Sequence, residues 1–225
     1  IQDHLETIQK DRGGLGHNVN NAALVAIDTH TGELRAMVGS RDYFSDEIDG
    51  AVNMAITPRQ PGSALKPLIY AAALDPKREN PWTAATMILD VPTTFRLHDG
   101  KAYTPSNYDL RFHGPVLVRE ALASSLNVPA VITLNEIGFE AFFGLAADMG
   151  FTTLGSPQES DLSLALGGGE VSLLELASVY GAFSRGGYRL NRIGITGIET
   201  ATGDYLYEAP PREGRRVLDE RVAWL

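Results

Sequence analysis

Residues 61–67 read Pro61-Gly62-Ser63-Ala64-Leu65-Lys66-Pro67, and this stretch is the most informative part of the sequence for both fold and function. Ser63 and Lys66 lie three residues apart at the expected start of a helix, so their side chains share one face. A serine hydroxyl is a poor nucleophile at neutral pH and needs an adjacent base, which a lysine amine can supply. Gly62 lets the backbone enter at an unusual angle, and Pro67 suits a first turn because it lacks a donor. The stretch predicts a helix that begins with an activated serine.

The expected helix runs from Ser63 to Leu74, is rich in Ala and Leu, and is mostly buried. Asp75-Pro76 should end it, because a residue before proline avoids the helical region. A single lysine on a helix is usually a surface residue, so a structural reading of Lys66 competes with the catalytic one. Further motifs have to decide between them.

Antiparallel hairpins are expected in three places. Strands at 22–28 and 34–39 flank a turn that contains Gly32. Two short strands flank His98-Asp99-Gly100-Lys101, and a last hairpin pairs 193–199 with 205–208. His30-Thr31-Gly32 is expected to be part of the first turn and nothing more.

Helices are expected between these hairpins, from apolar residues at helical spacing and from end signals, over residues 116–124, 130–137, 140–149 and 172–184. Gly150 should end the third, Ser172 opens the fourth with a capping-box pattern, and Asp219 looks like the start of another. Gly167-Gly168-Gly169 reads as a bend. The fold class is α/β of the α+β type, with a lead-in and linker over 1–20 and one domain over 21–225.

Composition narrows the function. The 225 residues carry a formal net charge of -9, which disfavours nucleic acid because binding phosphates needs a basic surface. The chain has no cysteine, so disulfides and thiolate metal sites are excluded. The five histidines form no ligand spacing, so neither a metal nor another cofactor is expected. No apolar run approaches the roughly 18 residues of a membrane span.

A second motif, Ser125-Leu126-Asn127, follows a predicted helix about sixty residues after Ser63. A hydroxyl and a carboxamide that leave a helix end can face the serine–lysine helix. The amide can orient a peptide substrate, and Ser125 can pass a proton to a leaving amine. An ordinary helix end followed by a turn is the structural alternative, since Asn is common at such positions.

Three stretches resemble the transpeptidase domain of class A penicillin-binding proteins, most closely the penicillin-binding protein 1C branch. They read Arg59-Gln60-Pro61-Gly62-Ser63-Ala64-Leu65-Lys66-Pro67, Ala121-Leu122-Ala123-Ser124-Ser125-Leu126-Asn127-Val128-Pro129-Ala130-Val131 and Leu164-Ala165-Leu166-Gly167-Gly168-Gly169-Glu170-Val171-Ser172. The first two carry S-x-x-K and S-x-N in the family's order. The resemblance extends over nearly all of residues 20–225 and implies the antiparallel sheet and helical subdomain of the penicillin-binding-protein and β-lactamase fold.

The resemblance implies serine acyl transfer that cross-links D-Ala-D-Ala stem peptides, with β-lactams acylating the same serine. It implies that Ser63 is the nucleophile, Lys66 its base, and Ser125 and Asn127 the relay and orienting groups. It also implies a substrate groove bordered by Gln60, Gly62, Tyr103 and Asn107. The parent protein would be a peptidoglycan synthase with a glycosyltransferase domain, anchored in the inner membrane with this domain in the periplasm.

The family's third motif, K-T-G, is absent. The lysines are Lys10, Lys66, Lys77 and Lys101, and none precedes Thr-Gly or Ser-Gly. We expect a C-terminally truncated domain with weak turnover or none. Two alternatives stay open at this point: a D,D-carboxypeptidase or β-lactamase on the same fold, which would use water as acceptor, and a non-catalytic sensor module that binds penicillin or a peptide.

Overall fold

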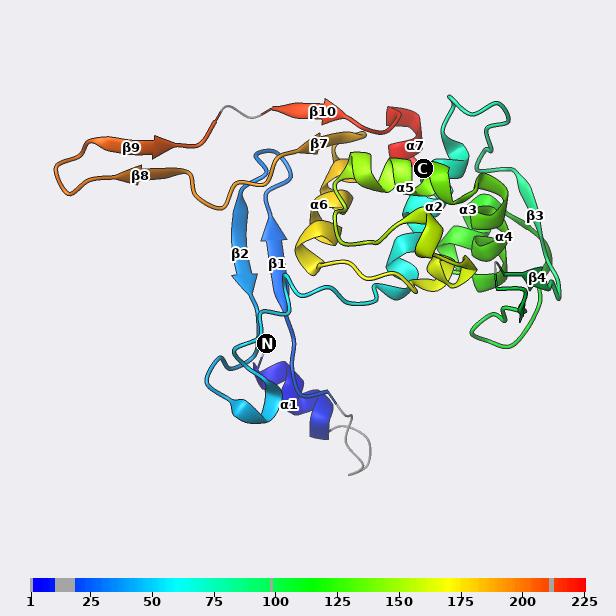
Figure 1. Ribbon diagram of the computed structural model, residues 1–225, viewed down its shortest axis with the longest axis horizontal. Coiled ribbons are helices and arrows are strands. Elements are labelled where there is room, and N and C mark those ends of the chain that lie inside the picture. The colour runs from blue at the N-terminus through cyan, green and yellow to red at the C-terminus, as the bar shows by residue number, and fades with distance from the viewer. Residues whose placement is uncertain (1, 11–18, 98, 211–212) are drawn as a thin grey trace.

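The computed structural model describes residues 2–10, 19–97, 99–210 and 213–225. Figure 1 shows a group of helices on one side of the molecule and a long hairpin extending from the other. The α-helices are α1 (Gln2–Lys10), α2 (Lys66–Leu74), α3 (Val118–Ala123), α4 (Asn127–Ile137), α5 (Phe139–Met149), α6 (Leu173–Ser184) and α7 (Glu220–Trp224). Short 3-10 turns are η1 (Asp46–Ile48), η2 (Gly62–Leu65), η3 (Pro157–Glu159) and η4 (Leu162–Leu166).

The strands form five antiparallel pairs in the described part of the chain. They are β1 (Leu24–Ile27) with β2 (Leu34–Val38), β3 (Met87–Asp90) with β6 (Gly114–Leu117), β4 (Phe95–Arg96) with β5 (Ala102–Tyr103), β7 (Tyr188–Leu190) with β10 (Gly214–Arg216), and β8 (Gly197–Glu199) with β9 (Tyr205–Glu208). The three expected hairpins are confirmed as β1–β2, β4–β5 and β8–β9. A bridge between Glu33 and Ile193 joins the first hairpin to the chain after β7.

Helix α2 forms the centre of the core. Its residues are apolar on nearly every face, and a helix of that kind is stable only when neighbours surround it. Helices α3, α4 and α5 contact it, and the largest side chains they bury with it include Tyr70, Leu134 and Phe142. Fully burying one such apolar side chain contributes about 1.5–3 kcal/mol, so this packing fixes the position of the residues at the start of α2.

The helix ends follow local signals. Gly138, at φ 79°, separates α4 from α5, and Gly150, at φ 112°, ends α5 by donating its N–H to Ala146. The Ser172 side chain accepts a hydrogen bond from the N–H of Glu175 and so begins α6. Both the predicted stop at Gly150 and the predicted start at Ser172 are confirmed.

Three expected boundaries are wrong. The helix expected from residue 116 begins at Val118, because residues 114–117 pair with β3 as a strand. The helix expected from Ser63 begins with the 3-10 turn η2, and its α-helical part starts at Lys66. The helix expected from Ala130 begins three residues earlier, at Asn127, where a distant side chain caps it. The expected linker glycines 13–16 and His98 lie outside the described residues.

No single described helix is long and apolar enough to cross a membrane. Helices α4 and α5 together reach the length and apolar composition of a span, but they are bent by 96° at Gly138. Both contribute buried residues to the core around α2, including Val131 and Met149.

Candidate active site

Lys66 lies at the start of α2 and is only 1% exposed. Its Nζ donates to the carbonyl oxygen of Ser125 at 2.6 Å, to Ser125 Oγ at 3.2 Å and to Asn127 Oδ1 at 2.7 Å. Both predicted motifs therefore meet at one amine. The surface-residue reading of Lys66 does not fit this burial.

Burial lowers the pKa of Lys66 from its ordinary 10.5 to about 8, because a desolvated amine resists carrying a charge. A base with a pKa near the working pH combines a usable neutral fraction with enough basicity to remove a proton. The protonated amine can donate to all three oxygen acceptors at once, which holds it in a fixed orientation.

Ser63 is exposed in the η2 turn, one residue after Gly62, which adopts φ 59°. Among the described residues its hydroxyl makes no hydrogen bond, so it is open to an incoming group. The hydroxyl and the Lys66 amine are not hydrogen-bonded to each other here, and catalytic contacts of this kind commonly tighten only with substrate bound.

Ser125 connects α3 to α4 and adopts φ 52°, in the left-handed region that few residues other than glycine occupy. Such a conformation costs about 1–3 kcal/mol and persists only where its surroundings enforce it. The turn brings the Ser125 carbonyl to Lys66 and leaves the side chain exposed. Ser125 therefore lies in a turn after a helix, as the structural alternative expects, whereas Asn127 is the first residue of the next helix. The turn itself builds the site.

Asn127 makes hydrogen bonds through both ends of its side-chain amide. Its Oδ1 accepts from Lys66, and its Nδ2 donates to the carbonyl of Ser106 at 2.9 Å. Its backbone N–H donates to Asn107 Oδ1 at 2.8 Å. The amide links the lysine to the loop that precedes β6.

Asn107 was expected at the substrate groove, and that expectation is wrong for its side chain, which is 2% exposed. Its Oδ1 also accepts from the N–H of Val128 at 3.2 Å, so it caps the first turn of α4. Helix N-termini leave unpaired N–H groups, and α4 has no cap from its own N-cap residue, Leu126. Asn107 supplies that cap from twenty residues away.

Asp90 and His113 were not anticipated from the sequence. Asp90 ends β3 with no exposed surface, and both its oxygens accept from Asn107 Nδ2, at 3.0 and 2.8 Å. His113 Nδ1 lies 2.6 Å from Asp90 Oδ2. An aspartate that ends the apolar run Met87-Ile88-Leu89 was the available signal, because buried acids need partners.

Gly167 packs against the loop that carries the serine. A Cβ at Gly167 would lie 2.2 Å from the backbone nitrogen of Gly62, so only glycine allows this approach. The hydroxyl of Tyr180 on α6 donates to the carbonyl of Ala64 at 3.1 Å. The expectation of a plain bend at the glycine run therefore understated its part in supporting η2.

The remaining predicted residues lie around the site without touching Lys66. Gln60 is exposed and, with Pro61, borders a cavity of about 460 Å³ between the start of β1 and α6. Tyr103 on β5 is half-buried, and burial together with the negative charge of Asp161 raises its pKa. The backbone N–H of His30 donates to Asp28 Oδ1, as expected of a turn residue.

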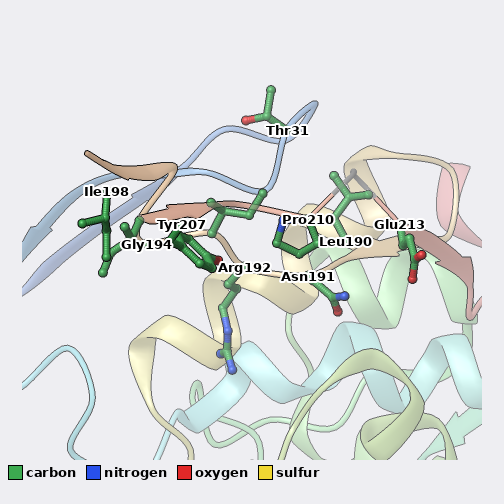
Figure 2. A pocket seen from close by; sticks show the side chains of 11 residues that line it. Thr31, Leu190, Asn191, Arg192, Gly194, Ile198, Tyr207, Pro210 and Glu213 are labelled. Atoms are coloured by element: carbon green, nitrogen blue, oxygen red, sulfur yellow. The ribbon is translucent and has the colours of Figure 1, made fainter. Parts of the chain in front are cut away.

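A second cavity, of about 470 Å³, is distinct from this site and is mostly apolar. Figure 2 shows its lining side chains, contributed by the first β-turn, by the segment from β7 to β8, by β9 and by the chain that follows it. Its labelled residues are Thr31, Leu190, Asn191, Arg192, Gly194, Ile198, Tyr207, Pro210 and Glu213. It holds neither Ser63 nor Lys66.

The family model described as "Penicillin binding protein transpeptidase domain" matches residues 22–225. Penicillin-binding protein 1A of Pseudomonas aeruginosa is 36% identical over 203 residues, which are 90% of this chain and 23% of that protein. Penicillin-binding protein 1B of Vibrio cholerae is 32% identical over 205 residues, covering 91% of this chain and 25% of that protein. This chain thus spans about a quarter of the length of these relatives, and the resemblance to a 1C branch stays a prediction.

Solved structures of penicillin-binding proteins are similar to this one. The crystal structure of penicillin-binding protein 1A from Haemophilus influenzae matches with a TM-score of 0.73 at 29% identity, over 89% of this chain and 29% of that one. Penicillin-binding protein A of Mycobacterium tuberculosis, as an imipenem acyl-enzyme complex, matches with a TM-score of 0.77 over 99% of this chain and 58% of that one. At 21% identity the latter shows the fold alone.

Proposed function

This chain belongs to the penicillin-binding protein transpeptidase domain family, and from that premise we propose that it carries the acylation site of a serine D,D-transpeptidase acting on peptidoglycan stem peptides. One observation carries the proposal: the buried Lys66 amine contacts both residues of the second motif and lies three residues after an exposed serine. The same serine would be acylated by β-lactams, as in the imipenem complex of the mycobacterial relative.

The proposed reaction begins when neutral Lys66 accepts the proton of the Ser63 hydroxyl. Ser63 Oγ attacks the carbonyl of the penultimate D-alanine, and the backbone N–H of Ser63 stabilises the oxyanion, a contribution of roughly 3 kcal/mol per donor. Ser125 passes its proton to the departing D-alanine amine and takes up the proton that Lys66 accepted from Ser63, so Lys66 is neutral again. An amine from a neighbouring stem then attacks the ester, which releases Ser63 and forms the cross-link. With a β-lactam, the ring opens and no group departs.

The rest of the parent protein's activity is proposed from the relatives. The chain contains no Lys-Thr-Gly or Lys-Ser-Gly, the family's third motif. We place the partial transpeptidase domain at 21–225 and a lead-in at 1–20. The parent would be a bifunctional synthase, anchored in the inner membrane, with this domain in the periplasm.

Two other functions are considered because the Ser63 hydroxyl and Lys66 amine are not in contact. A non-catalytic module would bind penicillin or a stem peptide without reacting. A D,D-carboxypeptidase or β-lactamase would deliver the acyl group to water, and no sequence feature identifies its deacylating acid.

The test is incubation with a fluorescent penicillin, followed by measurement of intact mass for the wild type and for Ser63→Ala. A Ser63-dependent adduct supports the proposal. A stable penicilloyl adduct, together with transfer of a D-Ala-D-Ala peptide to an amine acceptor and release of D-alanine, supports transpeptidation. Rapid hydrolysis of the penicilloyl adduct points to the β-lactamase. Absence of an adduct in the full-length protein would overturn all the enzyme readings and leave the binding module.

A further inference from the structure

We propose that Asp90, Asn107 and His113 form a positioning relay that holds the Ser125–Asn127 turn against Lys66. None of the three contacts Lys66, so each is a positioning residue and not a catalytic one. The inference rests on the proposed acylation reaction, because it assigns a rate effect to residues behind the site.

Asn107 is the centre of the relay, and its hydrogen-bonding capacity is fully used. Its Oδ1 accepts from the N–H groups of Asn127 and Val128, and its Nδ2 donates to Asp90 and to the carbonyl of Arg111 at 2.8 Å. Because Asn127 is the first residue of α4, its place depends on this cap. The same residue presents Oδ1 to Lys66.

The orientation of the Asn107 amide is fixed from both ends. On one side the Asp90 carboxylate and the Arg111 carbonyl can only accept, so the NH2 group points toward them. On the other side the N–H groups of Asn127 and Val128 can only donate, so the oxygen points toward α4. Asp90 contributes to this orientation by accepting from Nδ2 with both of its oxygens.

His113 completes the relay at the surface. Its backbone N–H and its Nδ1 lie 3.0 and 2.6 Å from Asp90 Oδ2, and its Nε2 lies 3.2 Å from Asp109. The hydrogen bond to Asp90, with the negative charges of Asp109 and Asp90, raises the pKa of the imidazole. Its side chain is 36% exposed, so it joins a fully buried carboxylate to solvent. An unpartnered buried carboxylate is strongly unfavourable, so the hydrogen bond from the imidazole stabilises Asp90 in its buried position.

The competing reading is a purely structural network that stabilises the fold without affecting the reaction. Exchanging the carboxylate of Asp90 and the amide of Asn107 distinguishes a positioning relay from a purely structural network. Asn107→Asp alone places two carboxylates in contact, and Asp90→Asn alone removes an acceptor of the Asn107 amide. The double variant Asn107→Asp/Asp90→Asn restores a carboxylate–amide pair and leaves an acceptor for Asn127 and Val128, but it removes the donor to the Arg111 carbonyl.

We would measure the rate of acylation by a fluorescent penicillin in the full-length protein, well below each variant's unfolding midpoint. Each single variant is expected to lose about 100-fold in rate, as small misplacements of reacting groups do, and the double variant should recover part of that loss. Asp148→Asn, the same change at an exposed pair with Arg215, is the matched control and should leave the rate unchanged.

His113 gives a milder second test should the buried variants fail to fold. His113→Asn keeps a donor for Asp90 and should stay close to the wild-type rate, whereas His113→Ala should be slowed. Equal rates for His113→Ala and the wild type, or folded single variants with unchanged rates, would overturn the relay. A double variant that regains stability but not rate would do the same. A wild-type protein that forms no adduct would instead overturn the proposed function.

Discussion

The amine of Lys66 lies 2.6 Å from the backbone carbonyl oxygen of Ser125, although 59 residues separate them in the chain. No substitution of the Ser125 side chain can remove a backbone acceptor. The lysine is therefore held by the path of the main chain as well as by the side chains of the second motif. Several expected outcomes depend on this arrangement.

Replacing Lys66 with methionine keeps most of the side-chain volume and removes the base. We expect the rate of acylation of Ser63 to fall by about 10²–10⁴-fold, the usual contribution of general base catalysis. The variant should remain folded, because it removes a buried amine and leaves an apolar chain. Stopped-flow labelling with a fluorescent penicillin measures the rate, and Lys101→Met, at an exposed turn lysine, is the control. Wild-type labelling by Lys66→Met would rule Lys66 out as the base.

The acylation rate should rise with pH through about 8, the value to which burial lowers the pKa of Lys66. Neutral Lys66 is the reactive form, so the rate levels off above that value. The folded pKa lies below the unfolded one, so the unfolded chain binds more protons between the two values and stability rises with pH across that window. Labelling over a pH series measures the expected rise in acylation rate. Urea unfolding over the same series measures the expected rise in stability. A profile without a step near that pKa would contradict the assignment of the base.

Ser125→Ala and Ser125→Gly both remove the hydroxyl, but only glycine relieves the backbone at φ 52°. We expect both to slow acylation, and Ser125→Gly to be more stable than Ser125→Ala by about 1–2 kcal/mol. Denaturant unfolding measures the difference. The neighbouring Ser124, at φ −90°, is the control, and there the glycine variant should be the less stable one. Equal stabilities for the two Ser125 variants would show that the turn is not strained.

Gly167→Ala should be the more damaging of two matched glycine substitutions. Gly155, at φ 91°, has open space where a Cβ would stand, so alanine there meets only the backbone penalty of about 1–2 kcal/mol. Alanine at Gly167, at φ 87°, meets that penalty and also the backbone of Gly62. We expect Gly167→Ala to lower the stability more than Gly155→Ala does. Only Gly167→Ala should also slow acylation. Comparable effects of the two substitutions would mean that the close approach does not position Ser63.

The sequence predicted the features that depend on neighbours along the chain. Ser63 and Lys66 are three residues apart, and the stop at Gly150 and the start at Ser172 use local hydrogen bonds. The features it missed depend on residues far apart. Asn107 looked like a loop residue beside a groove because nothing near it reveals Asp90 or the start of α4. Val116 and Leu117 looked helical because the strand they pair with, β3, lies elsewhere in the chain.

The amide of Asn127 already makes two hydrogen bonds, to Lys66 and to the carbonyl of Ser106. An amide has two N–H donors and two acceptor positions, so one N–H and one lone pair of Asn127 remain for a ligand. A peptide or β-lactam that accepts from this amide therefore meets a donor whose orientation is set before the ligand arrives. Preorganisation of this kind favours binding because little rotamer freedom is lost. A change in the loop around Ser106 would then weaken binding without touching the ligand.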